Sequence, residues 1–315
     1  RSYVDTTARN TRMSNALMTS YYPHRWISAA ANQVDGAGNF GRKAVREVVL
    51  AALNSEINAN QQIRDEESRV FNLIACPGYI ETIASLVALN YDRGISAFVV
   101  GDTPARLKPD ATTISNWGNN TDNAVNNSDD GLLTSDAYLG MFYPWGFTTD
   151  LLGNNVVVPP SHLIMRTIAL SDQVSYPWFA PAGFNRAALD FVNNVEVRLN
   201  VSDRDRLYDA RINPIATFPR LGFVIYGQKT LQIRKSALDR VNVRRLLLEV
   251  KRLIINIANR IVFEQNTPAV RNKFVADSIL QLGLIQAQAG IEAYQVVMNE
   301  TNNTQEDVDL NRLNG

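Results

Sequence analysis

The chain has 315 residues, and its 31 Lys and Arg balance 31 Asp and Glu, so the formal net charge is zero. A composition that is 45% hydrophobic and 20% charged is typical of a folded protein with about two domains. Neutrality removes the electrostatic attraction that drives non-specific nucleic-acid binding. One Cys and two His exclude a disulfide framework and argue against a metal centre, and no apolar run approaches the roughly 18 residues of a membrane span. Neither a cofactor nor membrane insertion is predicted.

The two ends of the chain predict a piece of a longer protein. The chain starts at Arg1 with no Met and no basic-then-apolar leader, so no signal peptide is predicted. It stops at Gly315, after a polar stretch, where a domain more often closes with a packed element. A processed or excised fragment is therefore expected.

The first hundred residues predict a strand–helix–strand unit. Residues 1–40 show weak periodicity, whereas apolar side chains recur at helical spacing over 42–64. An apolar run at 70–75, a helix at 81–91 and a second apolar run at 96–100 follow. This βαβ pattern predicts that the two strands are parallel.

The middle of the chain alternates loops with single elements. Residues 116–131 contain six Asn, three Asp and two Gly, which is typical of an exposed inserted loop. A strand is predicted at 138–145. Pro159-Pro160-Ser161 is expected to start a helix that runs to about residue 170. A Pro-rich bend at 176–183 follows.

The second half has a different pattern, with short strands before long helices. Strict alternation at 195–199 is typical of a half-buried strand. The longest helix is predicted at 236–264, where an apolar ridge recurs at steps of three and four. The other predicted elements are strands at 222–225, 230–233 and 293–298 and a helix at 268–282.

These elements predict a mixed α/β (α+β) fold of two domains, each a β-sheet flanked by helices. The first domain is expected at residues 1–187, with the Asn-rich inserted loop near 111–135. The second is expected at 188–315 and contains the long amphipathic helix.

A glycine pattern offers one alternative function. Gly36-Ala37-Gly38-Asn39-Phe40-Gly41 matches a dinucleotide-binding loop. Such a loop needs a preceding strand to aim the helix amides at the pyrophosphate, and residues 29–33 are a poor strand. A glycine-rich entry to a helix is favoured, and a nucleotide-binding α/β enzyme that uses Gly36–Gly41 is kept as the alternative.

Other reactive residue types have simpler interpretations. Cys76 is expected to be a small buried hydrophobe, because no His partner is evident. His162 is expected at the surface or at a helix cap. Asp203, Asp205 and Asp209 alternate with arginines and are interpreted as a mutually neutralised, solvated face. No catalytic residues are predicted.

Charge segregation is the strongest functional signal. Residues 229–260 carry nine Lys or Arg against two acids, and residues 292–310 carry five acids and no base. The two patches either neutralise one another within a subunit or meet between subunits or on a partner. Glu249 is placed to pair with both Arg245 and Arg252. The candidate subunit or tube interface comprises Arg240, Arg244, Arg245, Lys251, Arg252, Glu300, Glu306, Asp307 and Asp309.

The second half resembles the C-terminal domain of contractile tail sheath proteins of myoviruses and related injection machines. Six segments in the same order carry this resemblance. They are Tyr208 with Ile212-Asn213-Pro214-Ile215, Phe218-Pro219-Arg220 with Gly222, Tyr226-Gly227-Gln228-Lys229-Thr230-Leu231, Asn242-Val243-Arg244-Arg245-Leu246, Phe263-Glu264-Gln265-Asn266, and residues 294–304. More loosely, Pro77-Gly78, Asp102-Thr103-Pro104, Pro159-Pro160-Ser161 and Ala180-Pro181-Ala182-Gly183 resemble the middle domain of that family.

The resemblance implies a structural subunit and not an enzyme. Sheath subunits form stacked hexameric rings around a tail tube, and contraction drives the tube through the host envelope. The implied partners are other sheath subunits, the tail tube protein, the baseplate and the tail terminator. The implied location is the virion tail, after assembly in the host cytoplasm.

The resemblance also implies how neighbouring subunits stay connected. Terminal arms of the family add strands to a neighbour's sheet. Strands near 195–199, 223–226 and 294–298 are therefore expected to form one sheet with an open edge. Without such arms, the chain is expected to be monomeric in dilute solution.

Overall fold

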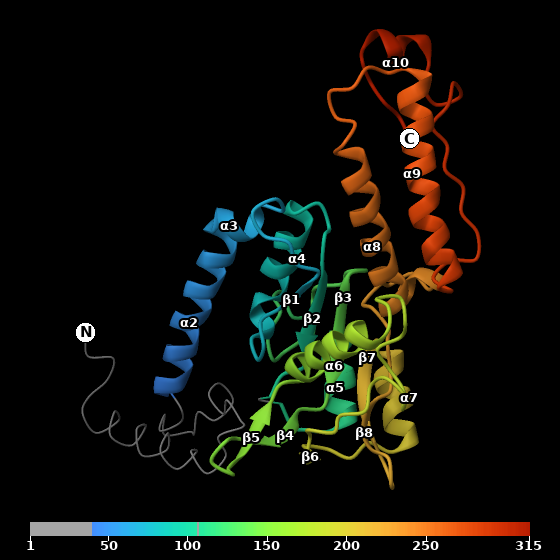
Figure 1. Cartoon of the computed structure of the whole chain (residues 1–315). Helices are drawn as coiled ribbons and strands as arrows, with labels where there is room; N and C mark the ends of the chain where they lie inside the picture. Colours follow the sequence, from blue (N-terminus) through green and yellow to red (C-terminus); the bar gives the residue numbers. More distant parts are fainter. Residues whose placement is uncertain (1–39, 106) are drawn as a thin grey trace, which may run out of the picture. The chain divides into compact units, whose positions relative to one another are not determined.

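The computed structural model describes residues 40–105 and 107–315, which divide into two units (Figure 1). The larger unit includes the described residues up to Tyr176 and residues Ala180–Arg244. The smaller unit consists of Pro177–Phe179 and Arg245–Gly315. The domain boundary predicted between residues 187 and 188 refers to family domains, and it stays a prediction.

A five-stranded sheet in the order β1-β2-β3-β7-β8 forms the centre of the larger unit. β1 (Leu73–Ala75), β2 (Phe98–Asp102), β3 (Leu139–Tyr143) and β7 (Ile212–Phe218) are parallel, and β8 (Gly222–Ile225) is antiparallel to β7. The predicted parallel pairing of the first two strands is confirmed. β2 and β3 are buried at every residue, as expected of a parallel sheet covered on both faces.

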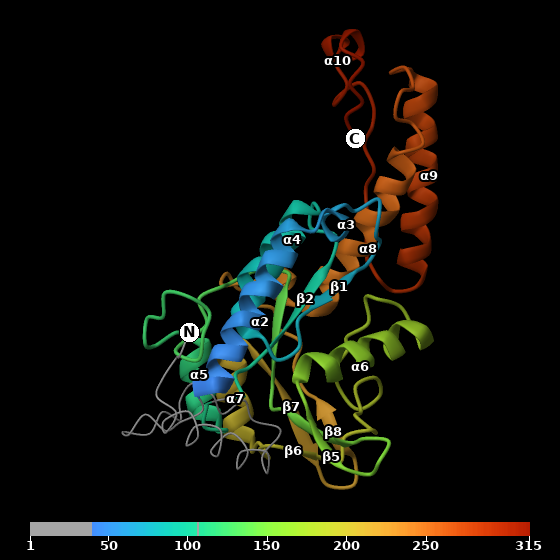
Figure 2. The ribbon, with the colours of Figure 1, turned by 90° about the vertical axis from the view of Figure 1, so that its left-hand side faces the viewer.

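Helices cover both faces of this sheet. In Figure 2, α4, α5 and α7 lie on one face and α6 lies on the other. Apolar side chains of α4, α5 and α7, among them Leu86, Ile114 and Leu207, pack with β2, β3 and β7 into one core. The helices of the unit are α2 (Phe40–Ala59), α3 (Gln61–Arg64), the 3₁₀ helix η2 (Ile80–Thr82), α4 (Ile83–Asp92), α5 (Ala111–Gly118), α6 (Pro160–Val174) and α7 (Val201–Asp209).

A second, three-stranded antiparallel sheet has the order β5-β4-β6. Its strands are β4 (Gly146–Thr149), β5 (Asn155–Val158) and β6 (Asn194–Val195). The β4–β5 hairpin was not predicted. The strand predicted at 195–199 is reduced to a two-residue pairing with β4.

The mixed α/β class is confirmed, but the sheets are distributed differently from the prediction. β7 and β8 belong to the second half of the sequence, yet they complete the sheet that β1–β3 begin. The segment 230–233 is not a strand, and residues 245–315 contain no strand at all. Alternation and apolar runs indicate which residues are extended, but they do not identify the partner strand.

The single sheet expected from 195–199, 223–226 and 294–298 is therefore wrong. Val195 pairs in the three-stranded sheet, Phe223 lies in β8 of the larger one, and 294–298 is not a strand. The outer edge of β8 is also covered by the chain itself. The amide of Ile225 donates to the carbonyl of Ala187 at 3.1 Å, and the amide of Leu189 donates to Phe223 at 2.8 Å.

Helices form the smaller unit. The helix predicted at 236–264 is shorter, because a 3₁₀ turn, η3 (Ala237–Asp239), precedes α8 (Val241–Ala258). α9 (Pro268–Ala287) and the acidic α10 (Gln305–Asp309) follow. In this unit, Trp178 packs with Leu246, Leu282 and Ile285, and its indole donates to the carbonyl of Gln288 at 3.1 Å.

One buried carboxylate, that of Asp102, ties three parts of the larger unit together. Asp102 is 2% exposed at the end of β2. It accepts from the Gly78 amide at 2.7 Å, from the Ser161 amide at 2.6 Å and from the Ser161 hydroxyl at 2.8 Å. The first turn of α6 is thus capped by a distant side chain and not by its own N-cap residue, Pro159. Three segments that carry the looser resemblance meet at this point.

Burial raises the pKa of Asp102 to about 6, although the hydrogen bonds from Gly78 and Ser161 act to lower it. A carboxyl whose pKa is higher in the folded than in the unfolded state stabilises the fold most below the unfolded-state pKa. That contribution is lost as the pH rises through about 6.

We predict that the wild type loses stability relative to Asp102→Asn between pH 4 and pH 7. The loss should be on the order of 3 kcal/mol, the equivalent of the pKa difference. Urea denaturation at both pH values measures it. Asp110→Asn is the matched control, because hydrogen bonds to Thr113 lower the pKa of Asp110 and its contribution is lost on acidification instead. An equal wild-type advantage over Asp102→Asn at both pH values contradicts the assignment.

Candidate assembly interface

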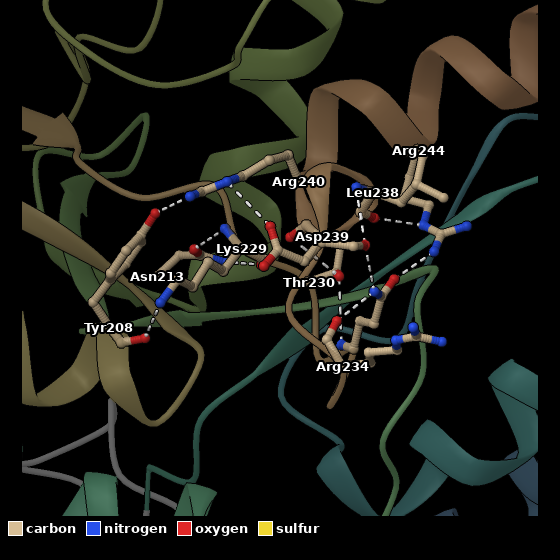
Figure 3. A network of polar contacts seen from close by, with 11 residues as sticks. Tyr208, Asn213, Lys229, Thr230, Arg234, Leu238, Asp239, Arg240 and Arg244 are labelled. Carbon is tan, nitrogen blue, oxygen red and sulfur yellow. Dashed lines mark hydrogen bonds and ion pairs between the residues drawn. The ribbon is translucent and has the colours of Figure 1, made fainter.

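A network of polar contacts joins α7, β7 and the segment 226–240 (Figure 3). We call it the Asn213 network, after the buried amide at its centre. Its other members include Tyr208 of α7 and three residues of the segment 226–240, namely Lys229, Asp239 and Arg240. Two of the six segments that carry the family resemblance supply Tyr208, Asn213 and Lys229.

The side chain of Asn213 bonds the backbone of the segment after β8, as a neighbouring strand would. It is 0% exposed, and its Nδ2 donates to the carbonyls of Met141 at 3.0 Å and Lys229 at 2.8 Å. Its Oδ1 accepts from the Lys229 amide at 2.6 Å. One side chain thereby bonds three backbone groups, one in β3 and two in the segment after β8.

Close approach at this point requires a glycine. A Cβ on Gly227 would lie 2.8 Å from Cδ of Pro214 and 3.0 Å from Oδ1 of Asn213. The adjacent Tyr226 amide donates to the carbonyl of Pro214 at 2.8 Å. The Tyr226-Gly227 pair therefore brings the chain against β7 where Asn213 can reach it.

Tyr208 holds two cations at the edge of the network. Nζ of Lys229 lies 3.8 Å from the centroid of the Tyr208 ring and donates to the Tyr208 carbonyl at 3.1 Å. Arg240 donates to the Tyr208 hydroxyl, and its Nε lies 3.1 Å from Oδ1 of Asp239. Partial burial lowers the pKa of Lys229, an effect that Asp209 opposes.

The segment 229–240 is closed into a loop by bonds at its two ends. Lys229 and Arg240 form an isolated antiparallel bridge, and the Thr230 amide donates to the carbonyl of Asp239 at 2.9 Å. The Leu231 amide donates to Leu139 of β3 at 2.9 Å, and its side chain is buried in the core of the larger unit. The 229–240 loop is thus bonded to the sheet of the larger unit.

Arg244 supports the same loop from the first turns of α8. Its Nε donates to the carbonyl of Leu238 at 2.8 Å, and a terminal nitrogen donates to Gln232. The guanidinium also lies 4.9 Å from the centroid of the Tyr138 ring. Arg244 therefore acts as a brace within one subunit.

The structure separates the five cations of the candidate interface. Arg240 and Arg244 belong to the network described above. Arg245 is 3% exposed, and its guanidinium donates to the carbonyl of Pro177 at 3.3 Å. Lys251 and Arg252 are exposed on α8, where Nε of Arg252 donates to Glu249 at 3.1 Å, as the spacing predicted. Lys251 and Arg252 are thus the most exposed of the five, whereas the side chain of Arg240 is 39% exposed but is held by Tyr208 and Asp239.

The acids of the candidate interface also differ from one another. Glu300 and Glu306 are exposed. Asp307 accepts from the Thr304 amide at 2.9 Å in the capping box of α10, and hydrogen bonds from Thr304 lower the pKa of Asp307. Asp309 accepts from Gln305 at 2.9 Å. The role of all nine residues as an interface stays a prediction.

Three exposed residues that the sequence analysis did not single out are Ile233, Arg234 and Lys235. They lie at the tip of the 229–240 loop, where Ile233 is 76% exposed. The sequence signal that could have found them is an isoleucine followed by two cations in a segment with no strand partner.

The simpler interpretations of the reactive residues agree with the structure. Cys76 packs partly buried against the core, and burial raises the pKa of its thiol. His162 is exposed. Asp203 instead serves in the capping box of α7, and the neutralisation predicted for Asp203, Asp205 and Asp209 stays a prediction. Within residues 40–105 and 107–315, no three His, Cys, Asp or Glu side chains are grouped to hold a metal ion. None of the helices described is long and apolar enough to cross a membrane.

The glycine pattern at Gly36–Gly41 falls largely outside the described residues. Only Phe40 and Gly41 are described, and they are the first two residues of α2. The predicted nucleotide loop itself, Gly36–Asn39, lies outside them.

Comparison with known proteins relates half of the chain to phage tail sheath proteins. The chain is 42% identical over 156 residues to the tail sheath protein of Vibrio phage KVP40, a match covering 50% of this chain and 23% of that protein. It is 36% identical over 156 residues to the tail sheath protein of Enterobacteria phage T4, covering 50% and 24%. The matched region thus spans about a quarter of each relative's length. No family model matches the chain.

Solved structures share the fold at lower identity. The six-fold symmetrised baseplate of the anti-feeding prophage has a chain that matches with a TM-score of 0.64 and 23% identity, covering 82% of this chain and 67% of that one. The contracted helical sheath of the same prophage matches with a TM-score of 0.61 and 21% identity, covering 82% and 69%. The resemblance to contractile sheath proteins inferred from the sequence is confirmed. The phage relatives are structural tail proteins and not enzymes.

We predict that Asn213→Ala lowers the free energy of unfolding by about 3 kcal/mol, because it removes three side-chain-to-backbone hydrogen bonds worth about 1 kcal/mol each. Urea denaturation measures the change. Asn193→Ala is the matched control. The side-chain amide of Asn193 donates to the hydroxyl of Thr149, and both residues are exposed, so its removal should cost about 0.5 kcal/mol or less. Equal losses for the two variants contradict the central role of Asn213.

Proposed function

From the homology of half of this chain to phage tail sheath proteins, we propose that the protein is a structural subunit of a contractile tail sheath. The 42% identity over 156 residues carries this proposal. The similar fold of a helical sheath in its contracted state supports it independently of that identity. Both findings favour a sheath subunit over the nucleotide-binding alternative.

The proposed subunit assembles with copies of itself into stacked hexameric rings around a tail tube. The tube, the baseplate and the tail terminator are its further partners, in a virion tail assembled in the host cytoplasm. The proposed domains are residues 1–187, with the inserted loop near 111–135, and residues 188–315.

Contraction in this proposal is a repacking of subunits between two lattices, and it drives the tube through the host envelope. Such a transition is a rigid-body movement in which interfaces change while each subunit keeps its internal contacts. Buried, fully bonded groups such as Asn213 and Asp102 suit a unit that must transmit force without deforming. No bound nucleotide is needed, because the free energy is stored in the first lattice.

Within this proposal, the exposed cations of α8 contact the tube or a neighbouring subunit. Arg252, with a side chain 51% exposed, is the clearest member of this surface. Lys251 lies beside it and is also exposed. Arg245 is buried and acts inside its own subunit.

We predict that the full-length protein forms hollow striated cylinders in electron micrographs, and that Arg252→Glu reduces their number while lowering the melting temperature by no more than about 1–2 °C. The reversal places two acids three residues apart on α8, which costs only a few tenths of a kcal/mol in the helix. Discrete small particles from the wild type contradict the proposed function.

Arg245→Glu is the matched variant, because it reverses a neighbouring charge that is buried. It should lower the melting temperature, since it buries an acid next to the carbonyl of Pro177. If Arg252→Glu assembles like the wild type, the exposed face of α8 is not an interface.

A further inference from the structure

The tip of the 229–240 loop presents both charge and apolar surface. Ile233 is 76% exposed and Leu238 is 41% exposed, and Arg234 and Lys235 are exposed between them. We call residues 233–238 the basic tip. Exposed apolar side chains beside cations are the composition of a protein-binding surface more than of a solvated turn.

The basic tip is held in one conformation. Nε2 of Gln232 donates to the hydroxyl of Ser236 at 2.9 Å and to the carbonyl of Arg234 at 2.5 Å. Arg244 in turn donates to Gln232 and to the carbonyl of Leu238 (Figure 3). A surface ordered before binding loses little conformational entropy when a partner docks.

The two cations of the basic tip differ from the other cations around them. Arg240 and Arg244 are occupied by Tyr208, Asp239, Gln232 and Leu238. In the part of the chain that the structure describes, neither Arg234 nor Lys235 has a side-chain hydrogen bond or ion pair. Their charges are therefore available to a partner.

The chain itself contains a segment with complementary chemistry. Residues 300–310 carry four acids and no base, and Glu300 and Glu306 are exposed. Leu310 directly follows α10 and is 51% exposed. An acidic element with an exposed leucine matches a cationic element with an exposed isoleucine in both charge and apolar character.

We propose that the basic tip, residues 233–238, of one subunit docks on residues 300–310 of a second copy of this chain. The inference rests on the proposed self-assembly and adds the surface that performs it. Two different surfaces of one chain make a heterologous contact, and repetition of such a contact generates a ring or a helical array. Within the basic patch at 229–260, the cations that pair with the acidic segment are thus those of the loop before α8, Arg234 and Lys235.

Photo-crosslinking from position 233 tests the contact in the full-length protein. Ile233 is replaced by p-benzoylphenylalanine, and equal amounts of unlabelled and nitrogen-15-labelled protein are mixed before irradiation. The expected result is an adduct of mixed isotope content between position 233 and a peptide within residues 299–312. Val125, which is 80% exposed on another loop, receives the same crosslinker as the control and should not label that peptide.

Charge exchange supplies the second measurement. Arg234→Glu with Lys235→Glu should lower the yield of the mixed-isotope adduct by about tenfold. Adding Glu300→Lys and Glu306→Lys to the partner copies should restore it. Failure of this restoration overturns the pairing of the two segments.

The remaining outcomes separate this inference from the proposed function. If analytical ultracentrifugation shows association but the mixed-isotope adducts lie only at other residues, the inference is overturned and the sheath function stands. Adducts of a single isotope place the contact within one chain and also overturn it. A protein that does not associate overturns both.

Discussion

The hydrogen bonds of the buried Asn213 side chain are the interaction on which the 229–240 part of the larger unit depends. It joins β3, β7 and the segment after β8: Met141 of β3 lies 72 residues from Asn213 in sequence, and Lys229 lies 16 residues from it. Because two of its three bonds satisfy the backbone of Lys229, which no strand pairs with, the chain can leave the sheet and form the 229–240 loop at a fixed position. The family-like residues around it, including Gly227 and Tyr208, are explained by this geometry.

The same network decides which charges can act between subunits. Nine cations between residues 229 and 260 look alike in the sequence, but burial and hydrogen bonding divide them. Lys229, Arg240, Arg244 and Arg245 are engaged inside the subunit. Arg234, Lys235 and Arg252 remain exposed. The cations that cluster in the sequence therefore fall into three groups. One is engaged inside the subunit, and the other two are exposed, on the basic tip and on the outer face of α8.

The sequence was sufficient for the elements with strong local signals and insufficient for the contacts between them. The βαβ unit was predictable because β1, α4 and β2 adjoin in sequence and their pairing follows from the connection. The pairing of β7 with β3 was not predictable, because the apolar sequence of a buried strand does not indicate which other strand it pairs with. For the interface, the patches were predictable from charge counts. The internal role of Arg245 was not, because its hydrogen-bond partner, Pro177, lies far away in the sequence.

Hydrogen–deuterium exchange at the Lys229 amide tests the central claim most directly. Its acceptor is Oδ1 of Asn213, a residue with no exposed surface. If Asn213 fixes the loop to the sheet, this amide exchanges as slowly as the amides of β3, through global unfolding of the larger unit. Exchange as fast as that of the exposed Ile233 amide would show that the loop opens independently of the sheet, and it would contradict the account.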